Sequence, residues 1–154
     1  MKQLHLKLDA AIAELGRLEA GVLAFCRRNG LDERLRHTLQ LVCDEWITNI
    51  VTHGYGGSPP ANGPPAIELW LRICDEDRVE LVIVDGAPFF DPTTHPEPDV
   101  TLPLERREAG GLGIHIIKRM MDRIEYVRAD GRNRLKLTKM RRMRKGVETD
   151  ERND

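Results

Sequence analysis

The chain has 154 residues, of which 40% are hydrophobic and 32% charged, and its formal net charge at pH 7 is -1. A chain of this length can bury a core without disulfides or a structural metal, and its composition excludes a mainly disordered protein. The near-neutral charge provides no overall attraction to nucleic acid or to an acidic membrane, so we expect neither as a direct partner.

The cysteines and the N-terminus bear on the cellular compartment. Cys26, Cys43 and Cys74 are odd in number, widely separated and free of C-x-x-C spacing. They therefore predict neither a disulfide framework nor a zinc site, and they fit the reducing cytoplasm. The N-terminal residues lack the apolar core of a signal peptide, and no segment approaches the roughly 20 apolar residues of a membrane span. We expect a cytoplasmic protein.

The N-terminal third is predicted to form a strand and two helices. Residues 3–8 alternate as a strand does, and Asp9 is a candidate cap for a helix that runs to about Asn29 and stops at Gly30. A second helix is predicted from near Asp32 to around Gly54. Each helix has one apolar stripe, formed by Ile12, Leu15, Leu18, Val22 and Phe25 in the first and by Leu35, Leu39, Val42, Trp46 and Ile50 in the second.

Two hairpins and a third helix are predicted in the rest of the chain. Residues 67–73 alternate and residues 79–84 are more continuously apolar, which indicates a hairpin whose second strand is central. The glycines of "AGGLGIH" open a helix with Ile114, Ile117 and Met121 inward. Residues 124–128 and 135–139, joined by a turn at residues 130–131, form the closing hairpin.

The order of these elements predicts the fold class. Helices placed on one face of the strands give an α+β two-layer sandwich, with a mixed, mostly antiparallel sheet. We expect a single domain over residues 1–140 and a flexible charged tail over residues 141–154. The proline-rich segment from residue 88 to residue 108 has no periodicity, and a loop of this length inside a domain is often a functional lid.

Three groups of residues are candidates for chemistry. Glu45 and Asn49 are four residues apart, so they share one face of the second helix, and His53 continues that line. Asn offers a neutral oxygen to magnesium and Glu can accept a proton, whereas a solvated polar face is the alternative. Asp44 is rotated by about 100° from this face.

The second candidate is Asp85, which ends an apolar strand in "VIVDGAPFFDP". A carboxylate there can accept a hydrogen bond from an exocyclic amine such as that of adenine, and the small residues that follow allow a flat ring to approach. A strand end followed by a plain turn is the alternative.

The third candidate is the glycine cluster Gly110, Gly111 and Gly113, where a helix begins. Its free amides and positive dipole end favour phosphate, although such glycines also occur in simple hinges. No GK[ST] follows, so this is not a Walker A loop. The basic run at residues 139–145 fits a solvated tail better than a nucleic-acid contact.

Taken in order, "DEWITN" with "HGY", "DGAPFFDP", "GGLGIHII", "MDRIEY" and "GRNRLKLTK" resemble the bacterial anti-sigma factor serine/threonine kinases of the GHKL type. The resemblance runs from about residue 35 to residue 139. It implies a Bergerat-type ATP-binding fold with ATP and Mg²⁺, a homodimer that uses the N-terminal segment and first helix, and two competing partners. These partners are an anti-sigma factor antagonist of the STAS type and a sigma factor.

The resemblance also implies roles for single residues. Glu45 matches the general base, Asn49 the magnesium ligand and Asp85 the adenine-reading aspartate, while His53 is placed near the phosphates. The stretch Gly110, Gly111, Leu112 and Gly113 matches the phosphate-binding turn. Residues 92–109 match the ATP lid, in which Arg106 or Arg107 is expected to reach the phosphates.

The chain departs from the family pattern at two places near the expected adenine site. Ala87 stands where the family has a glycine, and a positive φ there would be strained. Asn133 and Arg134 stand where related proteins place a threonine. The resemblance predicts a kinase that phosphorylates the antagonist on Ser or Thr. The alternatives are a partner-switching module of the same fold without kinase activity and an ATPase that uses Glu45 to activate water.

Overall fold

The structure, a computed structural model, describes residues 2–56, 65–96 and 111–141. The described strands form one antiparallel sheet of β1 (Lys2–Leu8), β2 (Ile67–Ile73), β3 (Arg78–Asp85), β4 (Arg123–Ala129) and β5 (Arg132–Met140). Their order across the sheet is β1-β2-β3-β5-β4. Every neighbouring pair within the described sheet is antiparallel, so the mixed pairing that we allowed for is absent there.

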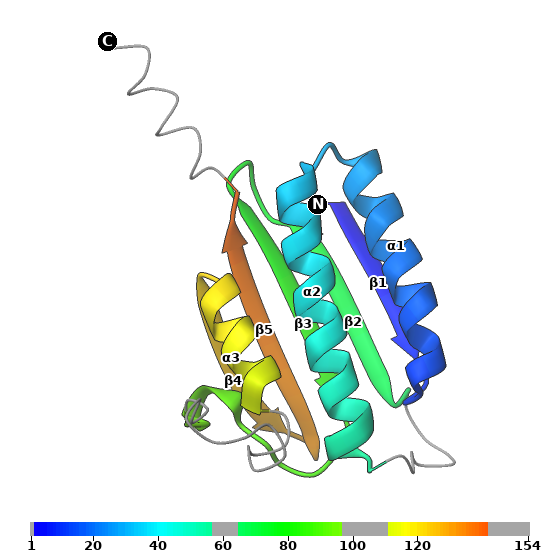
Figure 1. The fold of residues 1–154 in the computed structure, drawn as a ribbon, viewed down its shortest axis with the longest axis vertical. Helices are drawn as coiled ribbons and strands as arrows, with labels where there is room; N and C mark the ends of the chain where they lie inside the picture. Colours follow the sequence, from blue (N-terminus) through cyan, green and yellow to red (C-terminus); the bar gives the residue numbers. More distant parts are fainter. Residues whose placement is uncertain (1, 57–64, 97–110, 142–154) are drawn as a thin grey trace.

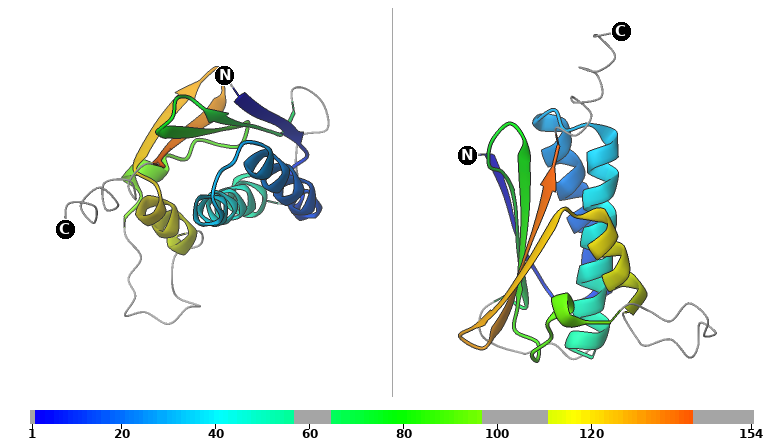
Figure 2. Two further views of the ribbon diagram at one scale, coloured as in Figure 1. Left: turned by 90° about the horizontal axis from the view of Figure 1, so that it is seen from above. Right: turned by 90° about the vertical axis from the view of Figure 1, so that its left-hand side faces the viewer.

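The described α-helices cover one face of the sheet, which confirms the predicted two-layer α+β architecture. They are α1 (Leu15–Arg28), α2 (Glu33–Asn49) and α3 (Gly111–Met120). Figures 1 and 2 show α2 across the middle of the sheet, with α1 beside it over β1 and α3 on the other side near β4. Among the described residues, no helix has both the length and the apolar character needed to cross a bilayer.

The core lies between the sheet and the helices, and strand alternation explains which residues enter it. Leu69 and Leu71 of β2 are fully buried, while Trp70 between them faces the open side of the sheet. The central strand β3 is buried over most of its length, as its continuous apolar run predicts. Val82 is buried even though it lies on the open face, because β3 has neighbours on both sides.

The beginning of the first helix differs from the prediction. A short 3-10 turn (Ile12–Glu14) precedes α1, and Asp9 caps neither element. Instead, the backbone N–H of Asp9 donates to Glu14 Oε2 at 2.8 Å. The predicted apolar stripe of the first helix included Ile12. This residue is 48% exposed, because the 3-10 turn does not continue the helical spacing of α1.

The remaining helix and turn signals behave as predicted. Gly30 has φ +68° just after α1, as a helix-terminating glycine does, and the Asp32 side chain caps α2 by accepting from the N–H of Leu35 at 2.8 Å. In the β4–β5 turn both central residues, Asp130 and Gly131, have positive φ. This is the pattern of a tight two-residue hairpin.

The last turn of the second helix is a π-helix (Ile50–Gly54), which we call the π-turn. The N–H of Tyr55 donates to the carbonyl of Ile50 at 2.8 Å, so this turn holds one residue more than an α-turn. The predicted end at Gly54 is therefore confirmed. The wider turn changes the direction of the side chains that follow Asn49.

Candidate functional site

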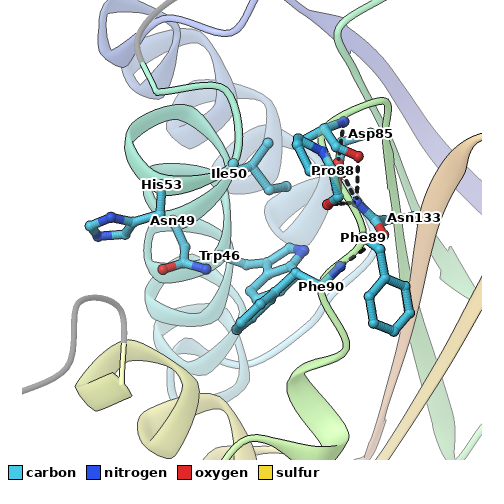
Figure 3. A pocket seen from close by; sticks show the side chains of 11 residues that line it. Trp46, Asn49, Ile50, His53, Asp85, Pro88, Phe89, Phe90 and Asn133 are labelled. Carbon is cyan, nitrogen blue, oxygen red and sulfur yellow. Dashed lines mark hydrogen bonds between the residues drawn. The ribbon is translucent and has the colours of Figure 1, made fainter.

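A cavity of about 170 Å³ lies between the C-terminal end of α2 and the loop that follows β3. One wall comes from α2 and the π-turn, and the other from the end of β3, residues 87–90 and the start of β5. Figure 3 shows both walls. Four of the predicted site residues line it, namely Asn49, His53, Asp85 and Ala87. The fold thus brings together residues from two separate candidate motifs.

Asp85 is the buried carboxylate of this cavity, with 2% of its surface exposed. Its Oδ1 accepts from the N–H of Ala87 and from Nδ2 of Asn133, both at 2.9 Å. Burial raises the pKa of Asp85 above its usual range, and the hydrogen bonds from Asn133 and Ala87 only partly oppose this. Among the described residues nothing donates to Oδ2, which is left as an acceptor for a ligand.

Asn133 holds the loop after β3 in place. Its Nδ2 donates to the carbonyls of Ala87 and Pro88 at 3.1 Å each, in addition to Asp85. Its Oδ1 accepts from the hydroxyl of Tyr126 and, at 3.0 Å, from Arg128 Nη1. All these partners fit one orientation of the amide, so Asn133 fixes the Asp85 carboxylate against both the loop and β4.

Ala87 adopts no strained backbone, because Asp130 is the one non-glycine residue with positive φ in the described part of the chain. Its methyl group packs close to Gly54: a Cβ built on Gly54 would lie 3.0 Å from the Cβ of Ala87. The extra methyl at residue 87 is therefore accommodated by a glycine on the π-turn. The strain that a positive φ would have caused does not arise.

Glu45 and Asn49 lie on the side of α2 that approaches α3. A Cβ built on Gly113 would lie 2.8 Å from Glu45 Oε2, so the first turn of α3 packs directly against this carboxylate. The absence of a side chain at Gly113 permits the approach. Glu45 and Asn49 are both half-buried, and no hydrogen bond from another described residue occupies either side chain.

The other predicted site residues are placed as follows. His53 lines the cavity but is exposed, and Figure 3 shows its ring directed away from Asp85. Gly111 begins α3, and Leu112 beside it is 45% exposed. Arg106, Arg107 and Gly110, and residues 97–109 of the predicted lid, lie outside the described residues, as does the tail after residue 141.

The described residues contain no cluster of three or more His, Cys, Asp or Glu side chains that could hold a metal ion. A divalent cation at Asn49 would therefore need most of its ligands from a bound substrate. This suits Mg²⁺, which commonly takes one or two protein ligands together with phosphate oxygens and water.

Aromatic residues of the cavity wall were missed in the sequence. Trp46 was assigned only to the core stripe, and Phe90 lay in the proline-rich segment without periodicity. In the structure the two rings stack with centroids 6.3 Å apart. The adjacency of Trp46 to Glu45 was the available signal, since a residue beside the polar line of a helix lies at the border of the core.

The chain is similar to known proteins over most of its length. The family model described as the histidine kinase-like ATPase domain matches residues 8–139. The serine/threonine-protein kinase BtrW of Bordetella bronchiseptica is 37% identical over 111 residues, covering 72% of this chain and 75% of the relative. The serine-protein kinase RsbW of Listeria monocytogenes is 28% identical over 132 residues, covering 83% of this chain and 80% of the relative.

A solved structure with a similar fold is that of the RsbU and RsbW domains of Rv1364c from Mycobacterium tuberculosis. It superposes with a TM-score of 0.64 over 91% of this chain, at 16% sequence identity, and this chain covers 33% of that longer one. At this identity the likeness supports the fold.

Proposed function

The chain belongs to the histidine kinase-like ATPase domain family, among the anti-sigma factor serine/threonine-protein kinases, and we propose that it binds Mg-ATP and phosphorylates an anti-sigma factor antagonist. The phosphate acceptor is a Ser or Thr hydroxyl of a STAS-type antagonist. The protein acts in the cytoplasm, where its second partner is a sigma factor.

One observation carries this proposal: the two ends of the cavity present different polar groups. At one end the buried Asp85 keeps a free acceptor oxygen for the amine of adenine. At the other end lie Asn49 and, beside it on α2, Glu45 against the first turn of α3. ATP has the matching polarity, with an amine on the base and anionic phosphates at the other end.

The residues at the phosphate end have separate roles. The first N–H groups of α3, at Gly111 and Gly113, have no partner within the helix and are suited to bind phosphate. We assign Gly110 to the same role, and Arg106 or Arg107 to the phosphates from the lid. Asn49 offers its carboxamide oxygen to Mg²⁺. When bound, Mg²⁺ would supply positive charge that offsets the charge of the phosphates.

Glu45 is the proposed general base. As the hydroxyl oxygen of the antagonist bonds to the γ-phosphorus, the bond to the bridging oxygen of ADP breaks, and the Glu45 carboxylate takes the hydroxyl proton. The phosphate brings about two negative charges to the antagonist. We infer that this charge weakens the complex with the antagonist and frees the protein, as a homodimer, to capture its sigma factor.

The test is phosphate transfer from labelled Mg-ATP to candidate antagonists from the same genome. The wild type should label one antagonist on Ser or Thr, and Glu45→Ala should bind ATP but transfer no label. Asp44→Asn is the matched control, because it removes the neighbouring carboxylate, which is rotated by about 100° from Glu45. The control should retain transfer.

The other outcomes distinguish the alternative functions. Tight ATP binding without transfer to any antagonist would contradict the kinase and favour partner switching by nucleotide binding alone. Release of inorganic phosphate without an antagonist, lost in Glu45→Ala, would instead indicate an ATPase. Ala87 has no positive φ, so the backbone strain that one of the two departures from the family pattern would have brought to the site is absent.

A further inference from the structure

The indole of Trp46 presents an unused hydrogen-bond donor at the cavity. Trp46 lines the cavity, yet the residue is only 3% exposed. Its Nε1 is buried, and no acceptor in the described part of the chain lies within hydrogen-bonding distance. Buried polar groups in folded proteins nearly always have a partner, so such an exception needs an explanation.

Packing alone does not explain a tryptophan here. The ring fills the space between α2 and the loop after β3, where it stacks on Phe90 at 6.3 Å with an interplanar angle of 29°. A phenylalanine or leucine would provide apolar contact at this wall without burying an N–H. The indole N–H therefore points to a ligand that brings an acceptor into the cavity.

The position of this donor relative to Asp85 indicates the kind of ligand. In Figure 3 the indole nitrogen lies on the edge of the ring turned toward the loop that carries Asp85 and Pro88. Asp85 Oδ2 is the free acceptor of the same cavity. The cavity wall thus offers one donor and one acceptor to a single bound ring.

Adenine matches this pair of groups. In adenine the exocyclic amine is a donor, and the ring nitrogens on either side of it, N1 and N7, are acceptors. In guanine the amine is replaced by the acceptor O6, which would face the Asp85 carboxylate. In this orientation the Asp85 carboxylate selects the adenine amine, and the donor beside it is placed to reach a neighbouring ring nitrogen.

We propose that Trp46 contributes to adenine binding by donating from Nε1 to the ring nitrogen next to the adenine amine, while Asp85 accepts from that amine. This inference rests on the proposed function, because it requires ATP to occupy the cavity. It gives Trp46, the neighbour of Glu45 on α2, a role in recognising adenine.

The test measures binding of ATP, 1-deaza-ATP and 7-deaza-ATP by calorimetry, each with Mg²⁺. Trp46→Phe keeps an aromatic ring and removes the donor, and it should weaken ATP binding by roughly 3- to 10-fold. One of the two deaza analogues should bind wild type more weakly by a similar factor and should bind Trp46→Phe with no further loss.

Trp70→Phe is the matched control. Trp70 lies on β2, where it stacks on His5 with ring centroids 4.8 Å apart and the Arg72 guanidinium lies 5.9 Å from its ring. These contacts are with β1 and β2 rather than with the cavity wall, so this variant should bind all three nucleotides as the wild type does.

The outcomes separate this inference from the proposed function. If wild type binds ATP and both deaza analogues equally well, Trp46 makes no such hydrogen bond, whether or not Trp46→Phe folds. Wild-type affinity for ATP in Trp46→Phe would also overturn the inference and would leave the proposed kinase standing. Absence of ATP binding by the wild type would overturn both.

Discussion

Replacing Asp85 with asparagine should weaken nucleotide binding while it keeps the local structure. The new amide oxygen can accept from the Ala87 N–H and from Asn133, as Oδ1 does now. The other oxygen becomes an NH₂ group and meets the adenine amine, so two donors face each other. A hydrogen bond to a charged group contributes about 1.5–3 kcal/mol, which predicts a roughly 10- to 150-fold loss of ATP affinity by calorimetry.

The same substitution should stabilise the free protein at neutral pH. Burial raises the pKa of Asp85, so the Asp85 carboxyl holds its proton more tightly in the folded chain than in the unfolded chain. Ionisation therefore costs stability as the pH rises through the folded-state pKa, and the cost is absent below the unfolded value of about 3.9. We expect Asp85→Asn to raise the free energy of unfolding at pH 7 by about 0.5–2 kcal/mol.

Urea unfolding at a series of pH values measures this effect. The difference between Asp85→Asn and wild type should shrink as the pH falls and vanish below the unfolded value of about 3.9, because the wild-type carboxyl is then neutral in both states. Asp75→Asn, in the exposed turn between β2 and β3, makes the same charge change away from the cavity and should leave ATP affinity unchanged. Wild-type ATP affinity in Asp85→Asn, or lower stability at pH 7, would refute the reasoning.

Three further predictions concern the phosphate end and the cavity wall. Asn49→Ala should weaken ATP binding much more with Mg²⁺ than in EDTA; equal losses would argue against a role in holding the metal. Gly54→Ala should lower the free energy of unfolding by about 1–3 kcal/mol in urea, because its Cβ would lie 3.0 Å from that of Ala87. Adding Ala87→Gly should recover most of the loss, and strictly additive effects would contradict this contact. Gly113→Ala should keep the fold but displace the flexible end of Glu45, 2.8 Å from the new Cβ, so phosphate transfer should fall more than ATP affinity; unchanged transfer would contradict this.

Local periodicity was sufficient to predict most of the fold. The alternation of β2, the apolar run of β3 and the stripe of α2 each place their own residues in the core, because each pattern depends only on near neighbours in the chain. The same reasoning places Glu45 and Asn49 one turn apart on α2. The start of α1 was less predictable, because a 3-10 turn there moved Ile12 out of the stripe.

The site depends more on contacts between distant parts of the chain. Asn133 pairs with Asp85 because β5 lies next to β3 in this register, and no local pattern specifies that register. In the sequence Asn133 was merely a departure from a threonine. In the fold its amide orients the Asp85 carboxylate. Trp46 likewise fits an apolar stripe, and only the position of the loop after β3 makes it part of a cavity wall with a buried N–H that has no partner among the described residues.

The π-turn also limits how this protein could be engineered. Deleting one residue between Ile50 and Gly54 would convert the turn to regular α-helix, a change that normally counts as an idealisation of the backbone. Here the extra residue sets the direction in which the chain leaves α2, and with it the contact of Gly54 with Ala87 and the hydrogen bond from the Tyr55 hydroxyl to the carbonyl of Ala66. A redesign for a more regular scaffold would therefore have to keep this irregular turn and place its helix-stabilising changes upstream of Glu45.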